Sequence, residues 1–516
     1  MNDISVNYSI GIGVAIFRAV AVNVNFNKRV MGLYNKSLIL VFAIGLFSLN
    51  SVYSQEKSKV NKEQFKSWAQ TPPMGWNSYD AYHGAVTEKQ FLESVDILEK
   101  KLLPYGYDVA TIDFCWFNPG PKGWSPDKWT TFPLKQLKDA DGNFSPLMTM
   151  DQYGRLLPAV NRFPSAKNNN GFKSIGDYVH SKKMKFGIHI MRGIARQAVA
   201  QNTPIKNSKY FAKDIAKVQD TCKWNNNMYG LDPFKPGAQE YYNSLFQLYA
   251  LWGVDFVKVD DISAPTYHAK EIELIRKAID KCGRPMVLSL SCGETMVSYA
   301  NHLERNANMY RISIDFWDKW KSVAHMFDLA YAWQPMINQG TWPDLDMIPI
   351  GNLCIGDYPL QEESSDKTEH FSRLNKEEQK TLMTLWCFAK SPLIWGGDPL
   401  TSKPEDFDMI SNKNLINIDQ YSVNNHQIAN FVYEGMQRED RIWTAESRDG
   451  KERYIAFFNL GEKSRDLSFY FHWEYWDGNY KFIDLWTNEE LGDFSNVFTA
   501  KNIPAHGVKA YKMIKK

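Results

Sequence analysis

Two short apolar runs in the middle of the chain each lead into acidic residues. The run Phe256–Val259 is short, rich in β-branched residues and preceded by a helical pattern, which indicates a buried strand ending at Asp260. A second run begins at Tyr310 and ends at Asp315, four residues after an arginine. Charged groups at the end of a buried strand are costly unless they are paired or used. Two acids on two strand ends suit a carboxylate pair that cleaves a glycosidic bond.

Neighbouring charges support this interpretation over a structural one. A strand-end aspartate often caps the next helix or holds a loop, and Asp261 and Asp318 are candidates for that use. Lys258 lies two residues before Asp260, so both side chains share one strand face, and the positive charge favours an ionised Asp260. Arg311 and Asp315, four residues apart on a predicted strand, are expected to share a face as well.

The surrounding pattern predicts the scaffold that positions these groups. From about residue 70, short apolar strands alternate with helix-length amphipathic segments, and one helix is marked by a capping box from Thr87 to Gln90. Eight such strands favour a parallel (β/α)8 TIM barrel, in which catalytic groups lie at the C-terminal strand ends. The predicted strands are 74–78, 109–116, 185–190, 256–260, 286–291, 310–315, 346–350 and 392–395.

Two further segments differ from this alternation. The connection between Ile190 and Phe256 is long, with predicted helices near 208–218 and 238–252, and is expected to form part of a cleft wall. After about residue 425, short strand-like runs divided by Gly, Asp and Asn turns predict an antiparallel β-sandwich. The predicted α/β architecture is therefore a TIM barrel over 70–424 followed by a sandwich over 425–516.

The N-terminal region has the pattern of a targeting sequence rather than of a folded unit. Lys36 precedes the apolar run 38–46, and small residues precede a cleavage position before Gln55. The run is short for a membrane span, so residues 1–54 are predicted to be an N-terminal extension and secretory signal peptide, with Met1 or Met31 as the start. A retained anchor is the alternative. Residues 55–69 are predicted to be a linker, and the mature protein is expected to be secreted or periplasmic, without stable membrane insertion.

Composition excludes several partner classes. The 516 residues are 44% apolar and 14% aromatic, with a net charge of +2, so nothing predicts a nucleic-acid surface. Six cysteines are spread without CxxC pairs or His-Cys clusters, which predicts no metal site; some of them could pair in an oxidising compartment. The expected partner is a carbohydrate, and no oligomeric state is predicted.

Six ordered motifs resemble glycoside hydrolase family 27, the α-galactosidase family, from about Thr71 to the C-terminus. They are the segments 71–78, 106–116, 252–260, 311–315, 342–347 and 390–394, and the ending 503–507 is also similar to the close of the family's sandwich. The resemblance implies the barrel and sandwich, a retaining mechanism and no cofactor. It makes Asp260 the nucleophile and Asp315 the general acid/base.

The same resemblance implies a set of sugar-binding residues. Asp113, Lys258, Arg311 and Asp346 would line the subsite of the terminal sugar. Tyr79 replaces a usual tryptophan of the pocket, and His189 stands where a tyrosine is common. Trp116 is expected to be a pocket wall.

One departure bears on the substrate. The family usually has two adjacent aspartates that read the 4- and 6-hydroxyls of galactose, whereas here the second is Phe114. Phe114 could cover an apolar edge of the sugar, or point into the helix layer instead. The sequence therefore predicts a retaining exo-glycosidase for α-linked galactose or a close relative. The alternatives are the same mechanism on a β-L-arabinopyranoside or an α-glucan oligosaccharide, and a non-catalytic carbohydrate-binding protein.

Overall fold

The computed structural model describes residues 64–120, 137–138, 144–145, 148–222, 224–225, 227–355, 368–428 and 439–516. The predicted signal peptide lies outside these residues. Among the helices that the structure describes, none combines the length and apolar character needed to cross a membrane. The six cysteines all fall in the described ranges and are free thiols.

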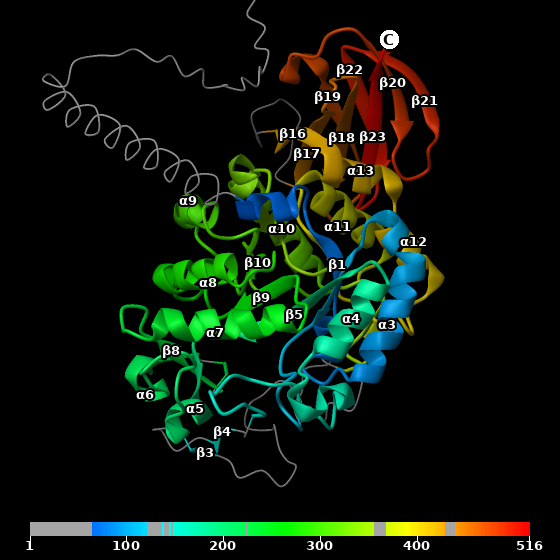
Figure 1. Cartoon of the computed structure of the whole chain (residues 1–516). Coiled ribbons are helices and arrows are strands. Elements are labelled where there is room, and N and C mark those ends of the chain that lie inside the picture. Colours follow the sequence, from blue (N-terminus) through cyan, green and yellow to red (C-terminus); the bar gives the residue numbers. More distant parts are fainter. Residues whose placement is uncertain are drawn as a thin grey trace, which may run out of the picture. The chain divides into compact units, whose positions relative to one another are not determined.

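Eight parallel strands form the predicted barrel (Figure 1). In spatial order they are β12 (Trp342–Asp344), β11 (Met309–Arg311), β10 (Val287–Leu290), β9 (Phe256–Asp260), β5 (Lys185–Met191), β2 (Val109–Ile112), β1 (Met74–Asn77) and β15 (Leu393–Trp395). Ile348, just past β12, joins the two edges: its N–H donates to the carbonyl of Ile394 at 2.8 Å, and its carbonyl accepts from Gly396 N at 3.0 Å. The curled sheet confirms the TIM-barrel prediction.

Two predicted strands end elsewhere in the structure. The strand predicted at 310–315 stops at Arg311, so Asp315 lies on the following loop and not on a strand. The strand predicted at 346–350 is β12, several residues earlier, and only Ile348 pairs beyond it. In the second segment the N–H of Asp346 donates to Oδ1 of Asp344 at 2.9 Å, and such local bonds compete with a strand ladder. In the first segment Ser313 donates to the distant carbonyl of Leu345.

Amphipathic helices cover the outside of the strands (Figure 1). The predicted helix α3 begins after Thr87, whose capping box with Gln90 is present, and it buries Phe91, Val95 and Leu98 as expected. The main helices are α3 (Glu88–Lys101), α4 (Lys173–Ser181), α7 (Ala238–Leu251), α8 (Ala269–Lys281), α10 (Trp320–Trp333), α11 (Lys376–Phe388), α12 (Pro404–Ile410) and α13 (Lys413–Tyr421). Shorter ones are α2 (Tyr79–Tyr82), α5 (Arg196–Gln201), α6 (Ala212–Ile215) and α9 (Ala300–Leu303).

The long connection after β5 builds a small sheet of its own. Its strands are β6 (Ile194–Ala195), β8 (Met228–Leu231) and β7 (Ala216–Thr221), in that spatial order. The helix predicted near 208–218 is a single turn, α6, because the chain then enters β7. Two more short pairs are β3 (Leu137–Lys138) with β4 (Phe144–Ser145), and β13 (Asn352–Leu353) with β14 (His370–Phe371).

The C-terminal strands form two antiparallel sheets over a separate aromatic core, as predicted. One sheet has the order β16 (Ser422–Gln427), β17 (Asp440–Ser447), β18 (Glu452–Asn459), β23 (Val508–Lys515), β20 (Asn479–Asp484) and β21 (Glu490–Ser495); the other pairs β19 (Arg465–Tyr470) with β22 (Val497–Ile503). Phe482 and Phe498 stack between the sheets with ring centroids 4.2 Å apart. The sandwich contacts the barrel through His506, whose ring stacks on Trp320 at 3.9 Å and bonds to Glu378 on α11.

Candidate active site

A cavity of about 240 Å³ opens at the C-terminal ends of the barrel strands. Eight of the predicted site residues line it, from six different strand ends or the loops behind them. They are Tyr79, Asp113, His189, Lys258, Asp260, Arg311, Asp315 and Asp346. Parallel strands present their carboxyl ends at one edge, which is why residues so far apart in sequence meet here.

Asp260 is held as an anion at the end of β9. Its Oδ2 lies 3.1 Å from Nε2 of His189, and its Oδ1 accepts the N–H of Asp261 at 2.7 Å. Burial alone would raise the pKa of Asp260, but His189 and Lys258 together hold it below the ordinary value. An ionised carboxylate with 14% of its side chain exposed is suited to attack an electrophilic carbon.

Lys258 and Asp113 form a buried ion pair beside Asp260. Nζ of Lys258 donates to Asp113 Oδ2 at 3.0 Å, and Nδ2 of Asn77 donates to the same oxygen at 2.7 Å. Burial works against the Asp113 charge, yet Lys258 and His189 lower the pKa of Asp113 to about 2. The pair therefore presents fixed opposite charges that sugar hydroxyls can bridge.

Arg311 connects the second acid to the pocket floor. Its NH2 donates to Asp315 Oδ1 at 3.1 Å and its NH1 lies 2.9 Å from Asp346 Oδ1. Asp315 is 71% exposed while Arg311 and Asp346 are buried, so Asp315 stands at the mouth of the cavity. Burial raises the pKa of Asp346 to about 7, against the opposing pull of Arg311.

Trp116 is not a pocket wall. The residue is fully buried, its indole N–H donates to the carbonyl of His189 at 2.7 Å, and its ring packs edge-on against Phe172 and Trp252. The chain turns at Cys115, which has a positive φ of 63°, and this turn directs the next residue away from the cavity. Trp116 instead supports the backbone of the strand that carries His189.

Phe114, the departure noted in the sequence, lines the cavity rather than entering the helix layer. Its ring meets His189 edge-on at 5.4 Å and lies tilted against Trp224 at 5.7 Å. Trp224 comes from the long connection after β5, which therefore contributes to the cleft wall as predicted. Together the two rings form an apolar wall opposite the charged residues.

The sequence did not single out several residues that shape the cavity. Trp224 lies 32 residues before the strand of Asp260, in a region without periodicity; its connection was predicted to form part of the cleft wall, but no pattern identified this residue. Asp80 lines the cavity although it is fully buried, and burial raises its pKa well above the ordinary value. Its position three residues after the end of a strand was a signal of the kind used for Asp260.

Arg192 is another residue that sequence reasoning missed, and it positions the nucleophile. Its N–H donates to the Asp260 carbonyl at 3.0 Å, and its Nε donates to the Asp261 carbonyl at 2.6 Å. Asp261 is thereby held at a positive φ of 58°, with its own N–H directed at Asp260 Oδ1. Arg192 is 3% exposed and is anchored by Asp220 and Glu271. A charged residue directly after a strand and before Gly193 was the available signal.

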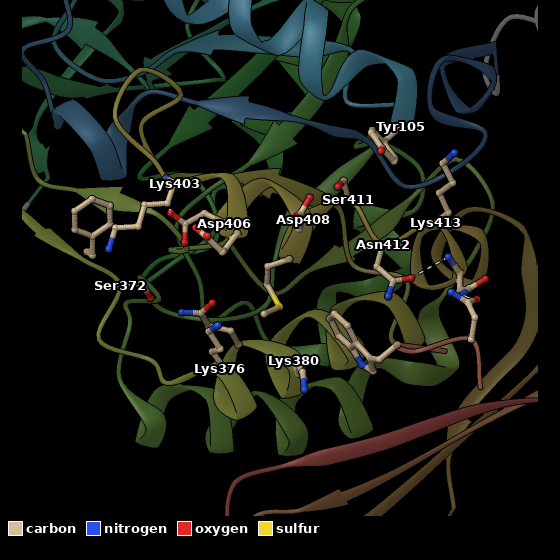
Figure 2. Close-up of a pocket in the computed structure, with 17 residues that line it drawn as sticks. Tyr105, Ser372, Lys376, Lys380, Lys403, Asp406, Asp408, Ser411, Asn412 and Lys413 are labelled. Atoms are coloured by element: carbon tan, nitrogen blue, oxygen red, sulfur yellow. Dashed lines mark hydrogen bonds between the residues drawn. The ribbon is translucent and has the colours of Figure 1, made fainter. Parts of the chain in front are cut away.

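A larger groove, of about 1150 Å³, lies between α11, α12, α13 and Trp486 (Figure 2). Lys403 and Lys413 lie over the rings of Phe371 and Tyr105, and Asp406 is already used to cap the N–H of Lys403 at 2.8 Å. None of the predicted site residues lines it. Size alone therefore does not identify the site. Within the described ranges, no group of three or more His, Cys, Asp or Glu side chains is arranged to hold a metal ion.

Both domains match family models of α-galactosidases. Residues 233–421 match the family model described as alpha galactosidase A, and residues 437–513 match the alpha galactosidase C-terminal beta sandwich domain. A β-L-arabinopyranosidase of glycoside hydrolase family 27 from Geobacillus stearothermophilus is 40% identical, with a TM-score of 0.79, over 87% of this chain and 98% of that one. A variant of that enzyme, solved in complex with arabinose, is 38% identical over 88% and 99% of the two chains, also at 0.79.

Relatives known for galactose are more distant. Alpha-galactosidase A of Cellvibrio japonicus is 24% identical over 499 residues, which cover 92% of this chain and 98% of the relative. The structure of alpha-galactosidase I from Mortierella vinacea, at 21% identity and a TM-score of 0.62, covers 87% of this chain and 98% of its own and shares the fold.

The role of Arg192 can be tested through the ionisation of Asp260. In Arg192→Gln the Asp261 N–H is no longer fixed, so the pKa of Asp260 should rise and the acidic limb of kcat/KM for a nitrophenyl glycoside should move up by as much as about one pH unit. Arg155→Gln is the control, because Arg155 is also a buried arginine paired with an aspartate, but its side chain bonds to Asp151 and to the carbonyl of Ser244 and not to the nucleophile segment. An unshifted limb in a folded Arg192→Gln protein would refute the positioning role.

Proposed function

Because the chain belongs to glycoside hydrolase family 27, we propose that it is a retaining exo-glycosidase that prefers a terminal β-L-arabinopyranosyl residue. The chain is a glycosidase of α-galactosyl or related sugars, and the proposal concerns the sugar and the roles of the side chains. The observation that carries the sugar assignment is Phe114, which occupies the cavity wall where the family usually has a second aspartate.

In the proposed mechanism, Asp260 attacks the anomeric carbon while the bond to the leaving oxygen breaks. Asp315 gives its proton to that oxygen, and the leaving group departs as an alcohol. Water then attacks the glycosyl-enzyme ester and gives a proton to Asp315, so the product keeps the substrate's configuration. The lowered pKa of Asp260 and the exposed position of Asp315 at the cavity mouth are consistent with these roles.

Phe114 favours a sugar without a polar group on that side. A β-L-arabinopyranoside resembles an α-galactoside that lacks its C6 group, so it offers no hydroxymethyl that would need a hydrogen-bond partner. Beside Phe114 a galactose hydroxymethyl would face the rings of His189 and Trp224. An unpaired hydroxyl in such surroundings is disfavoured by ~1–3 kcal/mol. The 38–40% identical relatives named as arabinopyranosidase point the same way.

The charged half of the cavity would hold the ring hydroxyls that both sugars share. Lys258 with Asp113, and Arg311 with Asp346, supply donors and acceptors that are already fixed by their mutual bonds. Such preorganisation costs little reorganisation when the sugar binds. An α-galactosidase is the second candidate, supported by the two matching family models and by the Cellvibrio japonicus relative.

The proposed catalytic roles predict that removing Asp260 and removing Asp315 both lower activity but give different products with azide. Asp260→Ala and Asp315→Ala should each lower kcat/KM by several orders of magnitude, on the order of 4–6 kcal/mol. With an activated nitrophenyl substrate, azide should give a glycosyl azide of inverted configuration from the Asp260 variant and of retained configuration from the Asp315 variant. Product NMR distinguishes the two azides, and near-normal turnover by Asp260→Ala would exclude it as the nucleophile.

The sugar assignment predicts a measurable change of preference at residue 114. The wild type should hydrolyse a nitrophenyl β-L-arabinopyranoside with a higher kcat/KM than the matching α-D-galactoside. Phe114→Asp supplies a hydrogen-bond acceptor for the C6 hydroxyl of galactose, which arabinopyranose lacks. It should therefore raise the ratio of kcat/KM for the galactoside to that for the arabinopyranoside by about tenfold or more.

Phe114→Leu is the matched control, because it opens space without adding an acceptor, and it should leave that ratio within a few-fold of the wild type. Circular dichroism and thermal unfolding establish that both variants are folded. A folded Phe114→Asp enzyme with an unchanged ratio would contradict the assignment.

We also propose that the protein is exported and acts outside the cytoplasm. The support is the sequence alone, namely the apolar run 38–46 and the small residues before Gln55. Expression from either Met1 or Met31 in a secreting host should yield a mature protein whose N-terminal sequence begins near Gln55. A mature chain that retains residues 31–54 would favour the anchor instead.

A further inference from the structure

A second cavity, of about 380 Å³, continues outward from the catalytic one. The two share four lining residues, Trp224, Cys292, Gly293 and Ile314. Ile314 directly precedes Asp315, so the second cavity begins beside the group proposed to protonate the leaving oxygen. From the continuity of the two cavities we infer that the second one is the binding site for the leaving group, and that it takes an apolar ring rather than a second sugar. The inference rests on the proposed glycosidase mechanism but not on the identity of the sugar.

The walls of this cavity are largely apolar. Met296 is 60% exposed and Ile314 is 59% exposed, which leaves both side chains open to a ligand. Tyr299 stacks face to face on Tyr267, with ring centroids 3.9 Å apart and planes within 6° of parallel. A flat apolar ring would therefore contact a rigid aromatic pair on one side and an adaptable methionine on another.

Four of the polar side chains that line the cavity are engaged with protein partners, and the hydroxyl of Tyr299 and the indole of Trp224 also line it. Ser263 donates to the carbonyl of Cys292 at 2.6 Å, and Sγ of Cys292 donates to the carbonyl of Ala264 at 3.3 Å. The hydroxyl of Tyr267 lies 2.7 Å from Nδ1 of His302, and Glu294 is paired with His325 at 2.8 Å.

The four engaged groups have fewer hydrogen-bonding positions left for a ligand, and this favours one class of leaving group over the other. A second sugar carries several hydroxyls that lose water on binding and need new partners. An apolar ring needs none and gains from the area that it buries. The same cavity would thus accept an aryl or alicyclic alcohol more readily than a hexose.

Three glycosides of one sugar test this directly, because methanol, benzyl alcohol and the 6-hydroxyl of glucose are alcohols of similar acidity. Differences in kcat/KM then report binding of the leaving group and not its departure. We expect the benzyl glycoside to exceed the methyl glycoside by about tenfold or more, and the glucosyl glycoside to stay within a few-fold of the methyl one.

Met296→Ala should lower the benzyl-to-methyl ratio several-fold, whereas Met296→Leu should preserve the ratio. Leu251→Ala is the matched control, since Leu251 is 69% exposed at the end of α7 and lines neither cavity. A wild-type ratio near one, a preference for the glucosyl glycoside, or a ratio unmoved by Met296→Ala would overturn the inference.

A different experiment tests the sugar assignment, so the two proposals can fail independently. That assignment compares two sugars with one leaving group, whereas this experiment compares leaving groups on one sugar. If α-galactosides prove to be better substrates, the three leaving groups are compared on galactose, and the expected ratios are the same.

Discussion

The burial of two cations beside three carboxylates is the constraint on which the site depends. Lys258 lies on β9 and Arg311 ends β11, with β10 between them; Arg311 is 3% exposed, and the side chain of Lys258 is 13% exposed. A buried charge without partners would cost several kcal/mol, so the strand ends must deliver Asp113, Asp260 and Asp346 to the same place. The barrel does this because parallel strands end at one edge. Fixed charges then face the cavity, so these groups reorganise little when a sugar binds.

The loops that follow the strands set the orientation of the two catalytic carboxylates. Arg192 holds the carbonyls of Asp260 and Asp261, so the Asp261 N–H points at the nucleophilic carboxylate. Gly293 is needed on the other side, because a Cβ there would lie 2.0 Å from the Ser313 carbonyl oxygen. That close approach lets the loop after β10 lie against the segment that carries Asp315. Neither device contributes a reacting atom, and both set where the reacting atoms lie.

Sequence patterns predicted the features that follow from local rules. Alternating strands and helices gave the barrel, and the capping box of Thr87 gave the start of α3 where the structure has it. Lys258 and Asp260 share a strand face because the strand period is two. Local rules failed where tertiary contacts decide. The positive φ of Cys115 turned Trp116 into the core, and the pairing of Asp315 with Arg311 is made by a loop rather than by a strand. Trp224 reaches the cavity from an insertion whose path no local pattern specifies.

The residue at position 114, in the apolar wall of the cavity, also affects the ionisation of the charged residues opposite. A carboxylate at position 114 would add a negative charge next to Asp113 and would share the attraction of Lys258, so the pKa of Asp260 would rise. Phe114 instead leaves Lys258 to its carboxylate partners and places its ring edge-on to His189. The residue that disfavours a hydroxymethyl group on the sugar therefore also helps to keep the nucleophile ionised, and sugar preference and nucleophile ionisation cannot be altered at this position independently.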